Sequence, residues 1–502
     1  MLELLAQGFA TALQPAALLA MSLGVAWGIL GGALPGITGS VAMALLLPLT
    51  FGMDATLALM VLAGVWAGAG YGGSIPAILI KTPGTPSAAA TVLDGYALHL
   101  QGKTGKALGI SLVTGTIGGI VSVVFLILLV VPLAEITLAF SPAEYFAVAL
   151  FGLTIISSLS GPSVLKGLIS ALAGLLLATV GLDPFSGAQR FTFKDPNLYD
   201  GFEIVAVMVG LFAVAEIIRQ AAFLPRRPEV RDRHASTEFP SLRELRGVSR
   251  ATFIGIVVGL IAGVMPGAGM TVASFVAYNE ARRFSAHPEL FGKGSMEGVA
   301  APETANNAVQ GGDLVPALAL GIPGSNSAAI MLAALILHGI TPGPLLLTKH
   351  PDIVYGLFAA LLIVNVLMLV IGFAILRVAM LVVNVPTQYL VMGVMLLVFI
   401  GTYSINNSVF DVWTALAFGV LGYFMNKYGF SPASMVLGMI LGFLMETSFR
   451  RALIVSDGSW AVFIERPISL FLLVLSFLTL CYPLIAKGLG AYRARNAGAR
   501  IV

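Results

Sequence analysis

The sequence predicts an all-α polytopic membrane protein, with about 11–12 transmembrane helices in two inverted repeats that contain Pro-Gly broken helices or re-entrant hairpins. Three observations lead to this fold class: the composition, a series of long apolar segments, and a pair of motifs that occurs twice. Of 502 residues, 58% are hydrophobic and only 10% are charged. A soluble domain carries about 25% charged residues, so little of this chain lies outside a bilayer.

The apolar segments are separated by short polar stretches, and a spanning helix needs about 20 residues. In the first part of the chain they cover residues 16–51, 57–80, 107–133, 143–159, 163–182 and 201–221. In the second part they cover residues 251–281, 297–337, 352–383, 386–403, 409–426, 431–447 and 465–487.

The longest hydrophilic stretch divides the chain into three expected parts. Residues 1–221 form a first transmembrane repeat, 222–250 a basic cytoplasmic linker, and 251–502 a second repeat with one extra helix. The linker has seven Arg against four acidic residues, and basic loops face the cytoplasm. The basic C-terminal tail is expected on the same side, and the N-terminus, which has no basic residue, on the other. Without a basic segment that N-terminus does not look like a signal peptide, so we expect it to be mature protein.

Two motifs recur in the same order in the two repeats. We call the first repeat the first copy and the second repeat the second copy. Residues Gly24, Gly28, Gly32, Pro35 and Gly36 align with Gly255, Gly259, Gly263, Pro266 and Gly267. Residues Pro76, Pro83, Gly84, Ser87, Ala88 and Ala89 align with Pro316, Pro323, Gly324, Ser327, Ala328 and Ala329. Equivalent loops differ in basic charge, which is typical of copies that cross the membrane in opposite directions.

Paired Pro-Gly breaks inside apolar segments favour a binding site. Proline removes a backbone donor, and unwound backbone survives at membrane depth only inside protein or beside a wet cavity. The broken-helix tips are Pro35, Gly36, Pro266 and Gly267. The expected substrate-binding residues near the other two breaks are Lys81, Thr82, Gly84, Thr85, Ser87, Gly324, Ser325, Asn326 and Ser327. The alternative is that the breaks are ordinary kinks. The Gly24, Gly28 and Gly32 series is expected to serve helix packing.

A polar stretch at 297–313 precedes the last break. Its Asn306 and Asn307 suit a carboxylate or hydroxyl ligand, and Glu303 or Asp313 could bind Na⁺ or carry a proton. Glu303 and Asn307 are four residues apart and would share a helix face. The alternative is a polar loop at the membrane interface. An interfacial loop is also the favoured interpretation of the segment around Asp94, with gating or partner contact as the alternative.

Other classes of protein lack support in the sequence. "GAGYGG" at 68–73 lies in an apolar span without a βαβ context, and "QGKTGK" lacks the first glycine of a phosphate-binding loop. The five His residues are scattered, and no nucleophile–base arrangement or metal cluster is recognisable. We therefore expect no enzyme, no metal, no cofactor and no nucleic-acid partner.

Three stretches resemble signature segments of a known family. They are "GILGGALPGITG", "GGSIPAILIKTPGTPSAAATVLDGYALHLQGKTGKALG" and "GVAAPETANNAVQGGDLVPALALGIPGSNSAA". They are similar to the large membrane subunit of tripartite tricarboxylate transporters, the TctA type, and the resemblance covers nearly the whole chain. It implies a multi-pass permease in the bacterial inner membrane. It also implies a small membrane subunit (TctB-type) and a periplasmic solute-binding protein (TctC-type) as separate partners.

The expected function is that of a permease subunit of a binding-protein-dependent secondary transporter. It would import di- or tricarboxylates, citrate-like anions, by symport with Na⁺ or H⁺, and the resemblance supplies the substrate class and the ion gradient. The alternative is a passive organic-anion channel, which would need no delivery protein.

Overall fold

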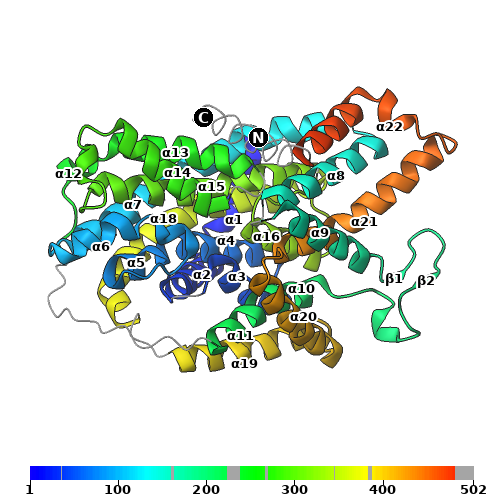
Figure 1. Cartoon of the computed structure of the whole chain (residues 1–502), viewed down its shortest axis with the longest axis horizontal. Coiled ribbons are helices and arrows are strands. Elements are labelled where there is room, and N and C mark those ends of the chain that lie inside the picture. The colour runs from blue at the N-terminus through cyan, green and yellow to red at the C-terminus, as the bar shows by residue number, and fades with distance from the viewer. Residues whose placement is uncertain are drawn as a thin grey trace, which may run out of the picture. The chain divides into compact units, whose positions relative to one another are not determined.

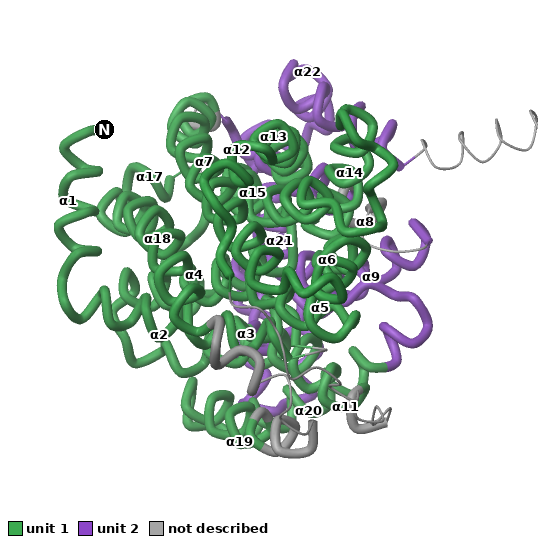
Figure 2. The backbone as a smooth tube through the Cα atoms, turned by 90° about the vertical axis from the view of Figure 1, so that its left-hand side faces the viewer, with its two compact units in different colours: residues 1–138, 205–423 green, residues 139–204, 424–502 purple. Residues whose placement is uncertain are grey.

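The computed structural model describes residues 1–34, 37–138, 140–159, 163–222, 238–265, 269–343, 345–382 and 387–480. Helices account for most of these residues, and the described strand consists of a two-residue antiparallel pair, β1 (Gly181–Leu182) and β2 (Gln189–Arg190). Figure 1 shows the helices in chain order, and Figure 2 shows two compact units, residues 1–138 with 205–423 and residues 139–204 with 424–502. The first unit contains parts of both predicted repeats.

The first stretch of the first unit, residues 1–138, contains nine helical elements. They are α1 (Leu2–Ala12), α2 (Pro15–Ala33), α3 (Gly39–Leu46), the 3-10 turn η1 (Leu47–Thr50), α4 (Ala55–Gly72), α5 (Ser74–Ile80), the 3-10 turn η2 (Pro86–Ala89), α6 (Val92–Leu100) and α7 (Thr104–Leu138).

A continuous helical stretch then leads to the linker, through α10 (Ile204–Met208), the π-helical η4 (Val209–Val214) and α11 (Ala215–Ala222). After the linker follow α12 (Leu242–Gly247), α13 (Ser249–Val264), α14 (Gly269–Phe284), the 3-10 turn η5 (Pro288–Leu290), α15 (Met296–Leu320), α16 (Asn326–Leu337), α17 (Leu346–Lys349), α18 (Pro351–Val382) and α19 (Thr387–Asn406). Helix α20 (Val409–Lys427) crosses the boundary between the units.

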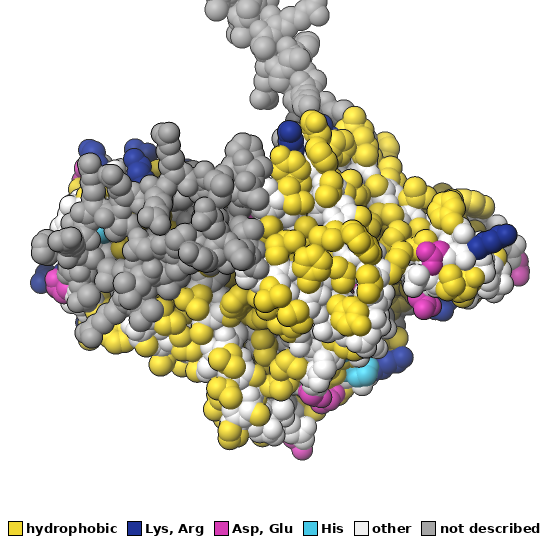
Figure 3. Space-filling model, turned by 90° about the horizontal axis from the view of Figure 1, so that it is seen from below, with side chains coloured by type: hydrophobic (Ala, Val, Ile, Leu, Met, Phe, Trp, Pro, Cys, Tyr) yellow, Lys and Arg dark blue, Asp and Glu magenta, His cyan; other side chains and the backbone are white. Residues whose placement is uncertain are grey.

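The chain is a multi-pass membrane protein. In its described part, six helices are long and apolar enough to span a bilayer, and six more apolar helices have 10–17 residues. Hydrophobic side chains cover most of the described surface in Figure 3, and charged side chains lie mainly toward its margins. The all-α fold class is therefore confirmed, whereas the count of 11–12 spans and the opposite orientation of the repeats stay predictions.

The glycine series of each copy brings two helices into backbone contact. A Cβ added at Gly28, on α2, would lie 2.2 Å from the carbonyl oxygen of Val65 on α4. A Cβ at Gly259, on α13, would lie 2.7 Å from the carbonyl oxygen of Ala305 on α15. Equivalent approaches occur one turn before and after, at Gly24, Gly32, Gly255 and Gly263. The predicted packing role of these glycines is confirmed, and the second copy repeats it.

The second unit contains α8 (Pro142–Leu159), α9 (Val164–Ala178), the two strands, the 3-10 turn η3 (Pro196–Leu198), α21 (Pro432–Val455) and α22 (Val462–Glu465). Helix α21 packs against α8 and α9.

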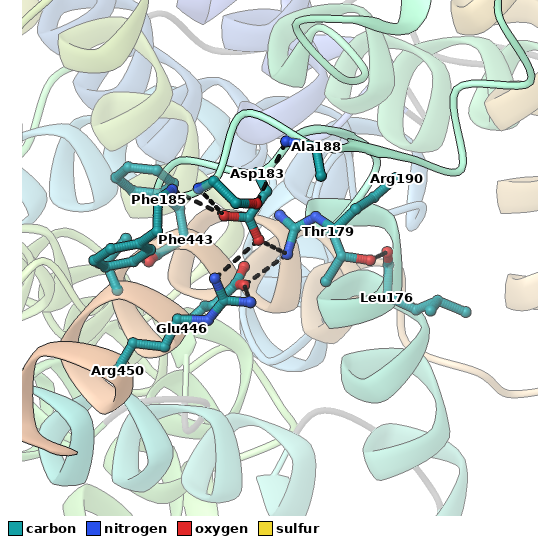
Figure 4. Close-up of polar contacts among 11 residues, drawn as sticks. Leu176, Thr179, Asp183, Phe185, Ala188, Arg190, Phe443, Glu446 and Arg450 are labelled. Atoms are coloured by element: carbon teal, nitrogen blue, oxygen red, sulfur yellow. Dashed lines mark hydrogen bonds and ion pairs between the residues drawn. The ribbon is translucent and has the colours of Figure 1, made fainter. Parts of the chain in front are cut away.

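A network of four charged side chains fastens the strand pair to α21 (Figure 4). Asp183 accepts hydrogen bonds from the backbone N–H groups of Phe185 and Ser186, and an ion pair of 2.8 Å joins it to Arg450. Glu446 forms ion pairs with Arg190 at 2.6 Å and with Arg450 at 2.8 Å. The two backbone donors, followed by Arg450, hold the pKa of the Asp183 carboxyl below its usual range. Hydrogen bonding to Glu446 raises the pKa of Arg190.

Candidate functional site

The second pair of Pro-Gly breaks has the same local structure in both copies. Helix α5 ends at Ile80 and is followed by Lys81, whose φ is +57°. Helix α15 ends at Leu320 and is followed by Gly321, whose φ is +73°. In each case the next residue donates its N–H to a carbonyl six residues back, at 3.3 Å. A left-handed residue closes a helix in this way and turns the chain out of it, so both breaks are true helix ends.

Each break also lies against the first long helix of its own copy. A Cβ added at Gly84 would lie 2.0 Å from the carbonyl oxygen of Gly32. A Cβ at Gly324 would lie 3.1 Å from the carbonyl oxygen of Gly263, the residue that aligns with Gly32, and 2.6 Å from Oδ1 of Asp313. The backbone leaves no room for a side chain at Gly84, and a side chain at Gly324 would force the Asp313 carboxylate to shift.

The elements that follow the breaks contact the other copy. The turn η2 packs against α14 and α15, and α16 packs against α3 and α4. Thr85 and Ser87 are buried and their hydroxyls are 3.0 Å apart, while Ser327 is buried and Asn326 exposed. Ser325 caps α16 by accepting an N–H from its first turn. Hydroxyl and backbone groups of both breaks therefore lie at the boundary between the copies.

The polar stretch at 297–313 is a buried helix, because α15 is buried from Gly298 to Ala319. This excludes the interfacial loop that the sequence left open. The amide group of Asn306 donates to the carbonyl of Gly70 at 2.9 Å, and that of Asn307 donates to the carbonyl of Glu303 at 3.0 Å. The amide oxygens of both asparagines have no hydrogen-bond partner among the described residues.

Glu303 is 1% exposed and is held by hydroxyl groups from two other elements. Thr91, just before α6, and Ser111, on α7 at 3.1 Å, donate to its carboxylate. The Ser111 hydroxyl also lies 2.8 Å from that of Ser74. The carboxylate thus joins the second copy directly to two segments of the first, and through Ser111 to Ser74.

Asp313 is fully buried and differs from Glu303 in lacking support. Within the described chain, neither of its carboxylate oxygens has a hydrogen-bond partner of normal geometry, although the Ser325 hydroxyl lies nearby. The residue that aligns with Asp313 in the first copy is Gly73. An ionised carboxylate without a partner is costly at such a position, so Asp313 needs a proton or a bound cation.

The model of the Tripartite tricarboxylate transporter TctA family matches residues 18–437. The chain belongs to this family. An Agrobacterium vitis protein described as an uncharacterized 52.8 kDa protein in the TAR-I ttuC' 3'region is 39% identical to the TctA-family chain over 469 residues, which is 93% of each. Another from that organism, an uncharacterized protein in the TAR-II ttuC' 3'region, is 38% identical over 227 residues, 45% of this chain and 94% of that protein. No solved structure matches the chain.

In the TctA-family chain the predicted site residues fall into separate groups. Asn306, Asn307 and Glu303 share one buried region, and Asp313 lies beside the second break. Lys81 and Thr82 are exposed, and the Lys81 ammonium lies 5.8 Å from the centre of the Tyr96 ring. Among the described residues, no hydrogen bond joins the hydroxyls of the two breaks. The predicted tips Pro35, Gly36, Pro266 and Gly267 lie outside the described residues.

Sequence reasoning missed several polar groups of the TctA-family chain. Thr91, Ser74 and Ser111 support Glu303, but single hydroxyl residues in apolar segments give no local signal. The buried Trp66 Nε1 and Tyr71 hydroxyl, which lack partners among the described residues, were also not predicted. The alignment of the two copies could have drawn attention to α4, because Trp66 aligns with Asn306 in that comparison.

Proposed function

We propose that this chain is the permease subunit of a secondary transporter that imports di- or tricarboxylates by symport with Na⁺ or H⁺. Its expected location is the bacterial inner membrane, and its expected partners are a TctB-type small membrane subunit and a TctC-type periplasmic binding protein. The observation that carries the proposal is the pair of similarly built helix breaks, each packed against the other copy. Beside one of them lies Asp313, whose carboxylate has no hydrogen-bond partner of normal geometry in the described part of the chain.

The helix breaks suit a carboxylate substrate. Helix α16 begins directly after the second break, and the unsatisfied N–H groups of a helix N-terminus favour an anion. Thr85, Ser87 and Ser327 add hydroxyl donors, and Lys81 adds a positive charge at the first break. The amide groups of Asn306 and Asn307 would complete a site at the boundary between the copies. Alternating access would then move one structural element of the site past the other.

The buried carboxylates suit the coupling ion. Among the described residues, the two carboxylate oxygens of Asp313 have no hydrogen-bond partner of normal geometry, so they could accept a proton or bind Na⁺. Glu303 already accepts hydrogen bonds from two hydroxyl groups. Its carboxylate can therefore exchange one of these partners for an ion and keep the other. We therefore assign coupling to Asp313 and Glu303, with Asp313 as the first candidate.

The test is labelled-citrate uptake into proteoliposomes that contain the chain, the small subunit and the binding protein. An imposed Na⁺ gradient is compared with an imposed pH gradient. Accumulation above equilibrium under one of them supports symport and names the ion. Equilibration under both contradicts symport and indicates the passive channel. Asp313→Asn should abolish accumulation. Its matched control is Asp411→Asn. Asp411 is also buried, but its carboxylate accepts a hydrogen bond from the Asn406 amide at 3.0 Å.

A further inference from the structure

The carboxylate of Asp94, on α6 of the first copy, is bonded entirely to the second copy. Its Oδ1 accepts the N–H groups of Gly294 at 2.8 Å and Ser295 at 2.7 Å. Its Oδ2 accepts the Tyr278 hydroxyl at 2.8 Å. The side chain is 0% exposed and lies on the helix α6, so the sequence-based interpretation of this segment as a loop is wrong for Asp94. Its three bonds close a joint between α6, α14 and the start of α15.

The surroundings of this joint are shaped to fit a carboxylate. A Cβ added at Gly298, in the first turn of α15, would lie 2.2 Å from Oδ2 of Asp94. Gly294 adopts a φ of +105°, which lets its N–H point at the carboxylate. The N-terminus of the 25-residue helix α15 also favours a negative charge. At the other end of α6, Gln101 donates to the carbonyl of Lys293 at 2.8 Å.

Helix α6 links this joint to the buried carboxylate of the candidate site. Thr91 stands three residues before Asp94 and donates to Glu303. A Cβ at Gly95 would lie 2.7 Å from the side chain of Ile78, so α6 also rests on α5, which leads into the first break. When α6 moves away from α15, the Asp94 bonds and the Thr91–Glu303 bond must break together.

In the described part of the second copy, the segment that aligns with α6 does not form an equivalent set of bonds. Alignment of the copies places Ala334, on α16, at the position of Asp94, and alanine cannot accept a hydrogen bond with its side chain. Asp54, which caps α4, uses its Oδ1 for two N–H groups of its own helix. The buried Nε2 of His338, at the end of α16, has no partner among the described residues. The bonded end is the one that carries Arg282, Arg283 and Lys293, which the positive-inside rule assigns to the cytoplasm.

We propose that Asp94 is a latch that closes the cytoplasmic end of the interface between the copies. The latch is a positioning device: it binds no substrate, and through α6 it keeps Thr91 on Glu303. Its release opens a path from the cytoplasm to the candidate site and frees a bonding position on Glu303. This inference rests on the proposed transport function, because a gate has meaning only in a chain that alternates access.

The test is cysteine labelling, which needs no substrate. Cys481, the one cysteine of the chain, is replaced by Ser, and the reporter Ala90→Cys is added at a 0% exposed position just before α6. A membrane-impermeant maleimide is applied from each side of oriented vesicles. We expect slow labelling of the reporter protein from both sides. Asp94→Asn should raise the rate from the cytoplasmic side by about tenfold, within the range of ordinary conformational coupling, and leave the other side unchanged.

Two further variants decide the result. Tyr278→Phe removes one of the three bonds and should give a smaller increase; it also serves as the test if Asp94→Asn does not fold. Asp411→Asn, a buried aspartate outside the joint, should not change the rate. Unchanged labelling in folded Asp94→Asn and Tyr278→Phe proteins would overturn the latch, as would equal acceleration by Asp411→Asn or rapid labelling without any of these substitutions. Failure of citrate uptake in the unsubstituted chain would instead count against the proposed function.

Discussion

Lys81 and Gly321 occupy equivalent positions in the two copies, and both adopt a left-handed backbone conformation, with φ of +57° and +73°. Glycine enters this region freely, whereas a residue with a Cβ pays about 1 kcal/mol or more. The first copy therefore keeps a strained lysine where the second copy has the unstrained residue. Backbone strain of this kind is concentrated at functional positions. Substitution of Lys81 is therefore a direct test of whether the first break binds substrate.

Replacement of Lys81 by glycine should separate stability from function. Lys81→Gly removes the strain and should stabilise the protein by about 1 kcal/mol, while substrate affinity falls because the charge is lost. Lys81→Asn should lose the same affinity, since asparagine tolerates this conformation but carries no charge. Thermal unfolding in detergent and binding of labelled citrate measure the two effects. Unchanged affinity in both variants would remove Lys81 from the proposed site.

Addition of a methyl group in the glycine series should destabilise the helix pairs. Gly28→Ala places a Cβ 2.2 Å from the carbonyl oxygen of Val65, and Gly259→Ala places one 2.7 Å from that of Ala305. Each substitution should lower the free energy of unfolding by about 1–3 kcal/mol, because neither backbone can move away without disturbing its own helix. Gly52→Ala is the control, since a Cβ there meets nothing within 4 Å. Equal unfolding temperatures for all three variants would show that the contacts are not close in the membrane.

The substitution Glu303→Gln should affect transport and stability differently. Glutamine keeps the side-chain volume and one oxygen that can accept a hydrogen bond from Thr91 or Ser111. Loss of the other hydrogen bond lowers the free energy of unfolding by about 1 kcal/mol, and removal of a buried charge offsets this loss. We expect nearly unchanged thermal stability together with the loss of ion-driven accumulation. Ser111→Ala, which removes a donor but keeps the carboxylate, should retain coupling. A Glu303→Gln protein that still accumulates citrate would exclude Glu303 from coupling.

The amide of Asn307 gives a test of substrate binding that does not depend on charge. Asn307→Ala removes the unpartnered amide oxygen and should weaken citrate binding and transport. Asn365→Ala is the matched control, because Asn365 is 1% exposed, has a similarly unpartnered oxygen and lies on α18, outside the predicted set. Full affinity after Asn307→Ala, or the same loss after Asn365→Ala, would contradict the assignment.

The docking of α12 should depend on pH. The Lys106 ammonium, followed by the Ser241 backbone and hydroxyl, lowers the pKa of Glu244 to about 2. Because this pKa is below the ordinary value of about 4.3, the ion pair stabilises the folded state above about pH 4 and is lost as the pH falls toward 2. Hydrogen exchange of the α12 amides should therefore differ between Glu244→Gln and the unsubstituted protein at pH 7 and converge at low pH. Glu289→Gln, on an exposed loop, should show no such difference.

Local sequence patterns predicted much of the fold. Runs of apolar residues gave the all-α membrane class, and the spacing of Gly24, Gly28 and Gly32 gave a helix contact that the structure confirms. Alignment of the copies also indicated that residues near 83 and 323 leave the helix. The left-handed conformation of Lys81 was not foreseen, because lysine is not a residue that usually ends a helix in this way.

The polar bonds of the site could not be predicted from the sequence. Thr91 and Glu303 are 212 residues apart, and Asp94 and Ser295 are 201 residues apart. No spacing rule connects such pairs, because their contact depends on how α6, α7 and α15 pack. The acidic residues of α15 were candidates from the sequence. Only the packed helices distinguish Glu303, which accepts hydroxyl donors, from Asp313, which has no donor of normal geometry among the described residues.

The network of Asp183, Arg190, Glu446 and Arg450 contains two positive and two negative groups within a few ion-pair distances. Opposite charges this close cancel when seen from farther than the screening distance of about 8 Å at physiological ionic strength. The proposed di- or tricarboxylate substrate would therefore feel almost no net field from these four groups. The ion pairs can therefore hold the strand pair without speeding or slowing the arrival of an anion. Any salt dependence of the proposed uptake would have to arise from other charged groups.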